Sequence, residues 1–591
     1  MKSFSHQFFS SARVFSKAFL VAGVWAAFLA YSVPLMAQDY ERIAPKTPPL
    51  NETPARLPEP AAPAEPGGDQ VLVSPLNGLV FLKSAGQVRK EGRPEIKGVW
   101  TEGLEILKTT EFQKLADDYL GQPVTLKRLG QLSRRVVEYY RSHDRPVVDV
   151  VVPEGQDITS GVIQFVVVEG RLGKVNVEGN HWFDTEMLEE QIRLMKGALI
   201  GEKALLSDIN WLNNNPFRLV NPVIARGERV GETDLTLKVK DRFPVRFYSG
   251  YEDSGNDLTG DERVLMGFNW GNAFLLDQQL NYQFTGDLHF NKLTAHSGSW
   301  VIPLPWRHRL TFFGSHAETK ADIANPLFNM GGHSWQTSSR YAVPLPGMGA
   351  YAHEASAGFD FKQSNNNLEF GGANVFNTTT EIAQWIFGYS GSFRDDWGSS
   401  GVDSSMVYSP GGMLERNKDS YFQVARANSF AEYKYARFDM NRTTRLPEDF
   451  AWIVKAGCQI SDGNLLGSEQ MGLGGYSTVR GYDEREANGD EGYFATTEIR
   501  TPPVSLGQVL GLPRQDDQLQ FLGFFDYGGT SNRILLPGEN ENIQLASTGF
   551  GLRYAITQYM SLRFDYGFQL HDTGLNPRYN SRGHLGLVVS Y

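Results

Sequence analysis

The sequence predicts an all-β membrane barrel of about 16 antiparallel strands, preceded by two small α+β domains. Alternating apolar and polar positions recur from about residue 245 to residue 591, where no long helix is expected. Two shorter regions before the barrel combine amphipathic helices with short apolar strands in one repeated order. About 347 residues, at about 22 for each strand with its loop, give the even strand number that bacterial barrels need.

The composition excludes several classes of protein. The 591 residues include 56 Lys and Arg against 67 Asp and Glu, and a net charge of −11 gives no basis for nucleic-acid binding. Charged residues make up 21% and the mean hydropathy is −0.34, which argues against a bundle of membrane helices. The single cysteine, Cys458, excludes a disulfide framework and any multi-thiolate metal site within one chain.

The N-terminus predicts a signal peptide over residues 1–37. Basic residues precede an apolar run over 18–36, which contains Pro34 and is followed by the small residue Ala37. The alternative is a single transmembrane anchor, for which this run is only just long enough. Residues 38–69 follow as a Pro-rich linker that cannot bury a core. Without another long apolar run, a mature protein in the membrane must span it as a closed barrel.

Residues 70–171 are predicted to form the first α+β domain. Thr125 is a suitable N-cap for the longer of its two helices, and its last two strands are expected to be adjacent. The expected elements are strands over 71–82, 147–152 and 162–168 and helices over 110–119 and 125–140.

Residues 172–242 are predicted to form the second α+β domain. Leu235, Leu237 and Val239 alternate with polar residues, which is typical of a half-buried strand. A β-α-α-β-β order in both domains indicates a tandem repeat, and two generic α+β domains are the alternative. The expected elements are strands over 174–178, 223–226 and 235–240 and helices over 185–195 and 207–213.

Alternation in the C-terminal part separates an apolar, aromatic face from a polar, often charged face. Leu562, Phe564 and Tyr566 alternate with charged residues, and the chain reaches residue 591 inside another such segment. In a soluble sandwich the charged face would lie outside, whereas in an outer-membrane barrel the apolar face meets lipid and the charged face lines the lumen. The signal peptide and an aromatic content of 12% favour the membrane. On this pattern Cys458 faces lipid and Gln459 faces the lumen.

Two motifs in the barrel region carry the functional prediction. Residues 472–482 are too glycine-rich for a strand and contain Val479, Arg480, Gly481 and Tyr482. In the predicted strand over 518–527, Phe524 and Asp526 share the face that points into the lumen. A carboxylate in that place needs water or a cation, and an arginine on a glycine-rich loop can bind it in a bidentate manner.

These motifs resemble those of a known family. The Val-Arg-Gly-Tyr loop and the Phe-x-Asp strand, with the segments 251–256 and 277–280, are similar to the outer-membrane transporters of two-partner secretion (TpsB type, haemolysin secretion/activation proteins) and to related barrel-assembly factors. The second domain resembles a polypeptide-transport-associated (POTRA) domain. The matching POTRA positions are Gly179, Asn180, Pro216 and Phe217.

The resemblance implies an outer-membrane translocator of type V secretion, with two POTRA domains in the periplasm and a barrel over 243–591. It would recognise an unfolded, large secreted partner protein by that protein's N-terminal secretion domain and export it through the pore. The resemblance also implies that Arg480 pairs with Asp526. We expect a monomer in contact with membrane lipid, without enzymatic activity, cofactor, metal or nucleic acid.

Several alternatives remain open. An insertase of the same superfamily shares the two barrel motifs, whereas a nonspecific porin would not explain the two domains before the barrel. A hydrolase has little support, because Ser315 beside His316 is weak evidence and Gly388 to Gly391 lacks the spacing of a nucleophile elbow. Many members of the family carry a plug helix at the N-terminus, but the prolines before residue 70 make one doubtful.

Overall fold

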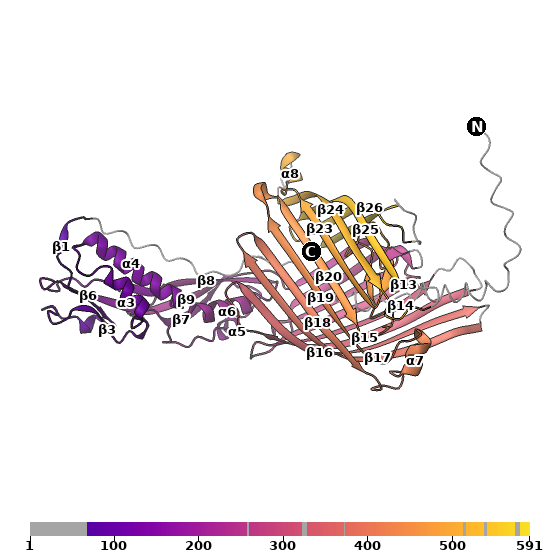
Figure 1. Cartoon of the computed structure of the whole chain (residues 1–591), viewed down its shortest axis with the longest axis horizontal. Coiled ribbons are helices and arrows are strands. Elements are labelled where there is room, and N and C mark those ends of the chain that lie inside the picture. The colour runs from indigo at the N-terminus through magenta and orange to yellow at the C-terminus, as the bar shows by residue number, and fades with distance from the viewer. Residues whose placement is uncertain are drawn as a thin grey trace. The chain divides into compact units, whose positions relative to one another are not determined.

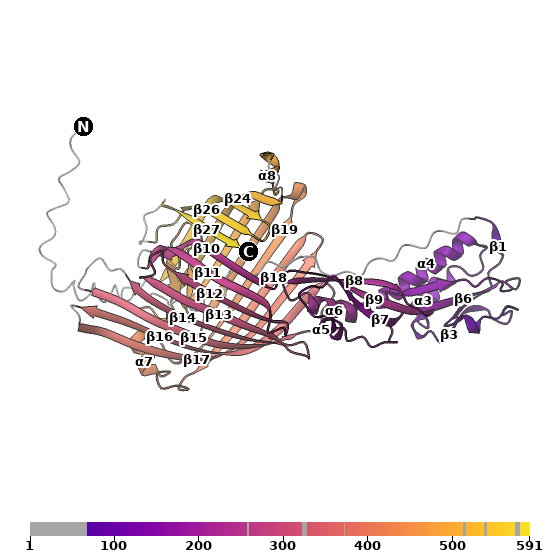
Figure 2. The same cartoon turned by 180° about the vertical axis from the view of Figure 1, so that it is seen from behind.

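The computed structural model describes residues 68–256, 259–321, 328–370, 373–511, 516–536, 541–573 and 580–591. The predicted signal peptide, the region considered for a plug helix and the linker up to residue 67 lie outside the described residues. The chain divides into two compact units at Pro244 and Val245, each with its own interior (Figures 1 and 2). Among the described residues, no helix is long and apolar enough to cross a membrane.

The first module of the N-terminal unit packs two helices on a mixed sheet of order β3-β2-β6-β5. β2 runs parallel to β3 and β6, and β5 pairs antiparallel with β6, so the predicted adjacency of the last two strands is confirmed. Its elements are β1 (Val71–Val73), β2 (Gly78–Leu82), η1 (Ala85–Gln87), β3 (Gly98–Glu102), η2 (Glu105–Leu107), α3 (Thr110–Asp117), β4 (Val124–Thr125), α4 (Leu126–Ser142), β5 (Val148–Val151) and β6 (Val162–Glu169).

α4 begins where the sequence predicts. The Thr125 hydroxyl accepts a hydrogen bond from the Arg128 backbone N–H at 3.2 Å and so satisfies one N–H of the first turn. One face of the helix is buried against the sheet through Leu129, Leu132, Val136 and Tyr140. Each buried aliphatic side chain of this kind contributes about 1.5–3 kcal/mol to folding.

The second module has the predicted β-α-α-β-β order. β7 runs parallel to the central strand β9, and β8 pairs antiparallel with its other side. Leu235, Leu237 and Val239 of β9 are buried, as their alternation predicts. The elements are β7 (Arg171–Glu178), α5 (Thr185–Glu190), α6 (Glu202–Leu212), β8 (Arg218–Arg226) and β9 (Glu232–Asp241).

Two expectations for these modules were wrong. The helix predicted over 185–195 ends at Glu190, because the Arg193 N–H donates to the buried Asp208 carboxylate at 2.9 Å and not to a helical carbonyl. The first module is not a simple copy of the second, since β1, β3 and β4 are additional strands. β3 has only two apolar residues, Val99 and Trp100, and it gives little sequence signal.

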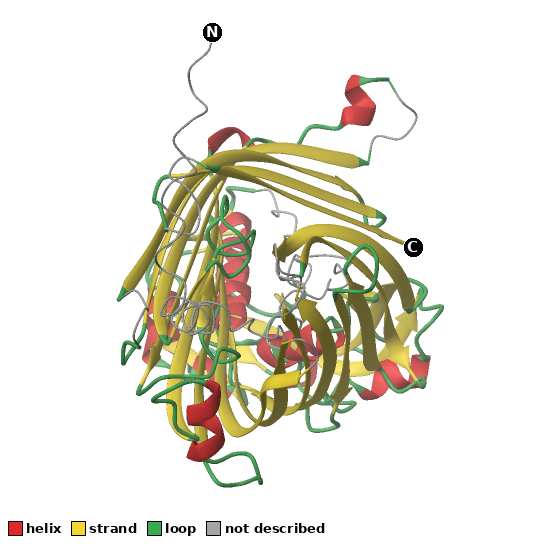
Figure 3. Ribbon diagram, turned by 90° about the vertical axis from the view of Figure 1, so that its right-hand side faces the viewer, coloured by secondary structure: helices red, strands yellow, loops and turns green. Residues whose placement is uncertain are grey.

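The C-terminal unit is a closed antiparallel barrel in which the described residues form 16 strands (Figure 3). The ring closes where β27 pairs with β10 over Tyr248–Glu252, and the backbone groups of Phe247 and Tyr591 add two hydrogen bonds. The strands of the ring are β10 (Val245–Asn256), β11 (Gly260–Ala273), β12 (Gln278–Gly286), β13 (Leu293–Pro303), β14 (Arg309–Ala321), β15 (Phe328–Pro344), β16 (Tyr351–Phe370), β17 (Ala373–Asp395), β18 (Gly398–Pro410), β19 (Glu432–Arg445), β20 (Ala451–Ser461), β23 (Glu491–Arg500), β24 (Asp517–Ser531), β25 (Asn542–Ile556), β26 (Met560–Gln569) and β27 (Ser581–Ser590).

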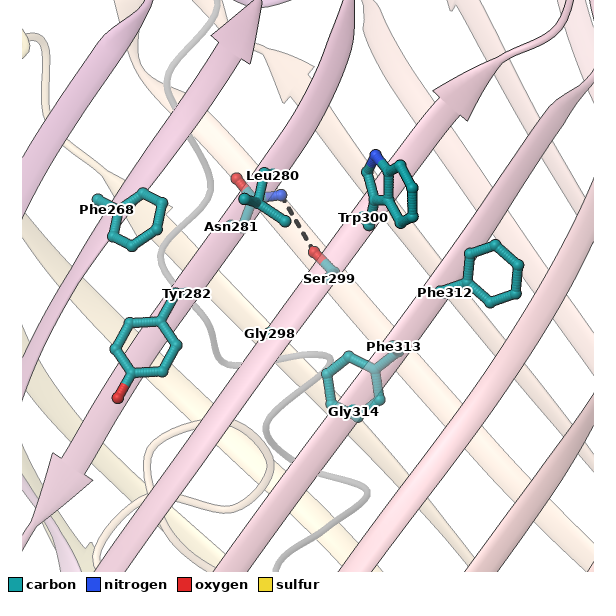
Figure 4. A pocket seen from close by; sticks show the side chains of 10 residues that line it. All are labelled: Phe268, Leu280, Asn281, Tyr282, Gly298, Ser299, Trp300, Phe312, Phe313 and Gly314. Atoms are coloured by element: carbon teal, nitrogen blue, oxygen red, sulfur yellow. Dashed lines mark hydrogen bonds between the residues drawn. The ribbon is translucent and has the colours of Figure 1, made fainter. Parts of the chain in front are cut away.

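The barrel wall is apolar outside and polar inside. On β12 to β14, Trp300 and Phe312 lie beside a shallow apolar depression of about 570 Å³ (Figure 4). Asn281 and Ser299 occupy the opposite face and hydrogen-bond to each other at 3.0 Å. Cys458 is exposed on the outer face of β20, whereas its neighbour Gln459 is buried inside. The predicted alternation of faces is therefore confirmed on this strand.

Short elements lie at the two ends of the barrel. We call the end at which the chain enters β10 the near end and the opposite end the far end. Because successive strands are antiparallel, the segments 411–431 and 462–490 both belong to the far end. The short elements are α7 (Asp419–Ala425), η3 (Pro447–Asp449), β21 (Met471–Leu473), β22 (Ala487–Gly489) and α8 (Leu506–Val509).

Candidate functional site

The predicted pore motif lies in the segment 462–490, which connects β20 to β23 and is named the lumen loop. Within this loop, residues 471–473 pair with residues 487–489 as the two-stranded antiparallel ribbon β21–β22. Residues 472 and 473 are therefore in a strand, which corrects the prediction that the whole glycine-rich segment is irregular. The ribbon narrows the loop to a hairpin whose tip contains Arg480.

Arg480 is almost fully buried and forms the predicted bidentate contact with Asp526 of β24. Its Nε lies 2.8 Å from Asp526 Oδ2, and its Nη2 lies 2.9 Å from Oδ1. The Arg480 backbone N–H donates to the same carboxylate at 3.1 Å. The guanidinium also stacks 3.6 Å from the centre of the Phe524 ring, so both residues of the predicted strand motif contact it.

Two further carboxylates contact Arg480. Its Nη1 donates to Glu498 of β23 at 2.7 Å and to Asp565 of β26 at 3.3 Å. Arg500 pairs with Glu498, and Arg553 pairs with Asp565, so three arginines balance three carboxylates in the lumen. Paired charges of this kind tolerate burial, whereas a single one does not.

The other three residues of the loop motif fix the tip by backbone contact and packing. Gly481 has a φ of +89°, and a Cβ at this position would come within 3.0 Å of the Gly567 backbone. Its N–H donates to His584 Nε2 at 2.9 Å. Val479 and Tyr482 are fully buried, and the Tyr482 hydroxyl lies 2.9 Å from two backbone carbonyl oxygens. The six predicted lumen residues thus meet on one wall, and their role in secretion stays a prediction.

Glu498, Asp565 and His584 also belong to the site but were not predicted from the sequence. Each lies on the polar face of an alternating strand near the C-terminus. This position on the polar face was the only sequence pattern that could have indicated them. The period of a strand places such a residue in the lumen but does not say which loop residue it meets.

A second buried carboxylate ties the lumen loop to its neighbours at the far end. Asp490 accepts hydrogen bonds from the guanidinium of Arg426, from Leu465 N at 2.9 Å and from Arg533 N at 3.0 Å. Arg426 follows α7, and Arg533 follows β24. One carboxylate therefore joins three segments of the far end.

The four predicted POTRA positions have structural roles in the second module. Gly179 has a φ of +86°, and a Cβ there would lie 2.5 Å from the Val239 carbonyl oxygen. Asn180 Nδ2 donates to the Phe183 carbonyl at 2.8 Å. Phe217 is buried under Arg242, which also donates to the Pro216 carbonyl at 2.9 Å. These contacts fix the turn after β7 and the start of β8.

A groove of about 1870 Å³ lies between the two modules of the N-terminal unit. It is lined by one face of α4, by β5 and by the end of β8, and none of the four POTRA positions belongs to its described lining. Among the described residues, β5 and β8 each pair with one strand, so each has a free edge. Val151 of β5 and Leu126 of α4 are 46% and 42% exposed in this groove.

Charged residues mark the rim of the groove. Arg226 of β8 lies 3.2 Å from Asp149 of β5, and the two modules meet at this exposed pair. Glu228 contacts Lys174, which lowers the pKa of Glu228 and raises the pKa of Lys174 through their hydrogen bond. The rim therefore remains charged at neutral pH.

The enzymatic alternatives do not fit the structure. Ser315 and His316 are successive residues of β14 and point to opposite faces of the barrel wall. Gly388 to Gly391 lie inside β17 and not at a turn. Within the described ranges, no group of three or more His, Cys, Asp or Glu side chains could hold a metal ion.

Comparison with known families decides what this barrel is. The family described as "Haemolysin secretion/activation protein ShlB/FhaC/HecB" matches residues 231–554, which is more than half of the chain. The chain belongs to the ShlB/FhaC/HecB family. The ShlB-type POTRA domain matches residues 95–170, which include most of the first module. This ShlB-family transporter is an outer-membrane β-barrel protein, and its near end therefore faces the periplasm, where POTRA domains lie.

Relatives of this ShlB-family protein have low sequence identity but similar length. The heme/hemopexin transporter protein HuxB of Haemophilus influenzae is 21% identical over 458 residues, with 75% of this chain and 78% of HuxB covered. The outer membrane transporter CdiB-2 of Burkholderia pseudomallei is 22% identical, with 61% and 62% covered. The structure of CdiB from Escherichia coli has a TM-score of 0.69 at 17% identity and covers 92% of this chain and 94% of CdiB.

Proposed function

We propose that this transporter binds an unfolded partner protein in the periplasm through the groove between its two modules and exports it through the barrel. The partner is a large secreted protein with an N-terminal secretion domain. One chain is sufficient for the pore, because β27 closes the ring on β10. We also propose the domain limits 70–171 and 172–242 for two POTRA domains and 243–591 for the barrel.

The observation that carries this proposal is the groove with two free strand edges. An unfolded segment arrives with unpaired backbone N–H and C=O groups, and β5 and β8 offer complementary groups along their edges. The exposed apolar side chains beside the edges, such as Val151 and Leu126, would bind alternate side chains of the added strand. Backbone pairing supplies affinity for many sequences, and the apolar groove supplies selectivity.

The barrel suits export of an extended chain. Its lumen wall carries paired charges and hydrogen-bonded amides, which do not favour adhesion of apolar segments. No nucleotide is needed in this scheme, since folding of the partner outside prevents it from sliding back.

The alternative function, insertion of other barrels, needs a ring that opens sideways. Here the closing strand pair is reinforced from inside by Arg563 of β26, which lies 3.1 Å from Glu252 of β10. Arg582 of β27 adds contacts to Asp253 and Asp261 at 3.3 and 3.2 Å. These ion pairs across the closure favour a pore that stays closed laterally.

Val151→Asp tests the groove. A charge on the edge of β5 opposes burial of an added strand, so secretion of the partner should fall at least about tenfold, the effect of losing about 1.4 kcal/mol of binding. The readout is the amount of partner in the medium, at equal levels of assembled barrel. Met195→Asp is the matched control, because Met195 is 77% exposed in the same unit but outside the described groove lining. Equal secretion by the two variants would contradict the proposal.

A further inference from the structure

Besides Asp490, the lumen loop contains another buried carboxylate that none of its motifs predicts. Glu469 is fully buried at the start of the loop. Lys362 of β16 donates to its two carboxylate oxygens at 2.9 and 3.1 Å, and the Tyr435 hydroxyl of β19 donates to Oε2 at 2.8 Å. Gln384 of β17 donates to the same oxygen at 3.2 Å. Side chains from three strands thus converge on one loop residue.

Without Glu469, the wall around it would hold more cations than carboxylates, since Arg340, Lys362 and Arg437 would share Asp360. Arg340 pairs with Asp360 at 2.6 Å, and Gln384 links Asp360 to Glu469. Lys362 is a second buried cation, close to Asp360, and its ammonium group is hydrogen-bonded to Glu469. Because burial of an uncompensated charge is costly, this part of the wall forms a socket for a loop carboxylate.

The socket lies on a different part of the barrel wall from the Arg480 site. In the ring order of 16, the partners of the Glu469 side chain lie on the seventh, eighth and tenth strands (β16, β17 and β19), and those of the Arg480 side chain lie on the twelfth, thirteenth and fifteenth (β23, β24 and β26). Glu469 and Arg480 are only 11 positions apart in the sequence, so this stretch of the lumen loop passes from one part of the wall to the next.

We infer that Glu469 and Lys362 form a second anchor of the lumen loop, and that the loop obstructs the pore because it is held at two separate places on the wall. Glu469 is a positioning residue, since it acts through the loop and not on the exported chain. Each anchor fixes its own part of the loop against the wall, and either anchor alone is sufficient to retain the rest of the loop in the lumen. The inference rests on the proposed function of the barrel as an export pore.

Ion conductance of the purified full-length protein in planar lipid bilayers tests the inference without any partner protein. Glu469→Ala and Arg480→Ala should each raise the resting conductance modestly, because one anchor remains. The double variant should raise it by much more than the sum of the two increases. Lys362→Met combined with Glu469→Ala should conduct no more than the larger single variant, because both residues belong to one anchor. Glu415→Gln, which removes an exposed carboxylate from the segment 411–431, is the matched control.

A second measurement, cysteine labelling, uses a milder substitution of Glu469 and so does not depend on variants that assemble poorly. The Gln459 side chain is 1% exposed and donates to the Glu469 carbonyl at 3.1 Å. In a Cys458→Ala background, Gln459→Cys should resist a charged maleimide and become reactive when Glu469→Gln is added. Glu469→Gln retains an acceptor for Tyr435 and removes only the charge, so it should assemble normally.

Wild-type conductance of Glu469→Ala, together with a fully open Arg480→Ala pore, would overturn the inference, as would strict additivity of the two. A pore that opens as described but exports no partner would count against the proposed function alone. The two failures are therefore distinguishable.

Discussion

The N-terminal unit and the barrel place their polar groups in opposite ways. In the first module, Phe81, Phe112 and Phe165 form an apolar interior, and charges lie outside. In the barrel, exposed aromatic residues such as Phe521 and Phe550 face outward, and the interior holds the ion pairs of Arg480 and Glu469. In the barrel, contact between the apolar outer face and lipid takes the place of an apolar core. Burial of apolar side chains inside the barrel therefore contributes little to its stability.

This difference changes which substitutions are costly. In the N-terminal unit, a cavity in the apolar core costs about 2–5 kcal/mol per large side chain removed. In the barrel lumen, the cost comes from leaving a charge without its partner, about 3–5 kcal/mol for a buried pair. The interior of the barrel is therefore specified by pairs of distant residues and not by hydrophobicity.

The largest expected effect comes from removing one region entirely. Deletion of residues 70–240 should leave a barrel that inserts in the outer membrane, because none of its described strands depends on that segment for pairing. Secretion of the partner should fall to background, since the groove is lost. Heat-dependent gel mobility checks insertion, and partner in the medium measures export. Continued secretion by the deletion variant would show that recognition does not depend on the N-terminal unit.

A smaller effect is expected from the lumen ion pair. Arg480→Ala should reduce secretion more than Asp526→Ala, because it leaves three carboxylates without Arg480, whereas Asp526→Ala leaves Arg480 with Glu498 and Asp565. The double variant should lose much less than the sum of the single losses. Arg480→Lys should restore little, because it lacks the planar fork. Purely additive losses would mean that the two residues act separately.

The smallest effect is expected from cysteine substitutions on β20, which change only the reactivity of the thiol toward maleimides and leave secretion unchanged. Cys458 is exposed on the outer face, so it should react with a membrane-soluble maleimide and resist a charged, impermeant one. In a Cys458→Ala background, Lys455→Cys should show the reverse preference, because Lys455 is an exposed residue on the lumen face of β20. Mass spectrometry of the labelled protein gives both yields. Identical yields at the two positions would contradict the assigned faces of β20.

The sequence was informative wherever local chemistry decides the structure. Thr125 marks the start of α4, and Leu235, Leu237 and Val239 identify the buried face of β9. The predicted end of helix α5 was wrong because Asp208, 15 positions after Arg193, accepts the Arg193 N–H on which a longer helix depends. A competing acceptor at that distance leaves no mark in the helical pattern.

The sequence by itself determined the family motifs, the alternation of faces and the identity of the loop that enters the lumen. These features repeat over a few residues, and a strand or helix period is sufficient to read them. Only the tertiary structure decided which strands hold the loop, since Arg480 meets Asp565 from 85 positions away and Glu469 meets Lys362 from 107. The groove likewise joins Asp149 and Arg226, 77 positions apart. Closure of the ring and packing of the modules set these pairs, and neither is a local property of the chain.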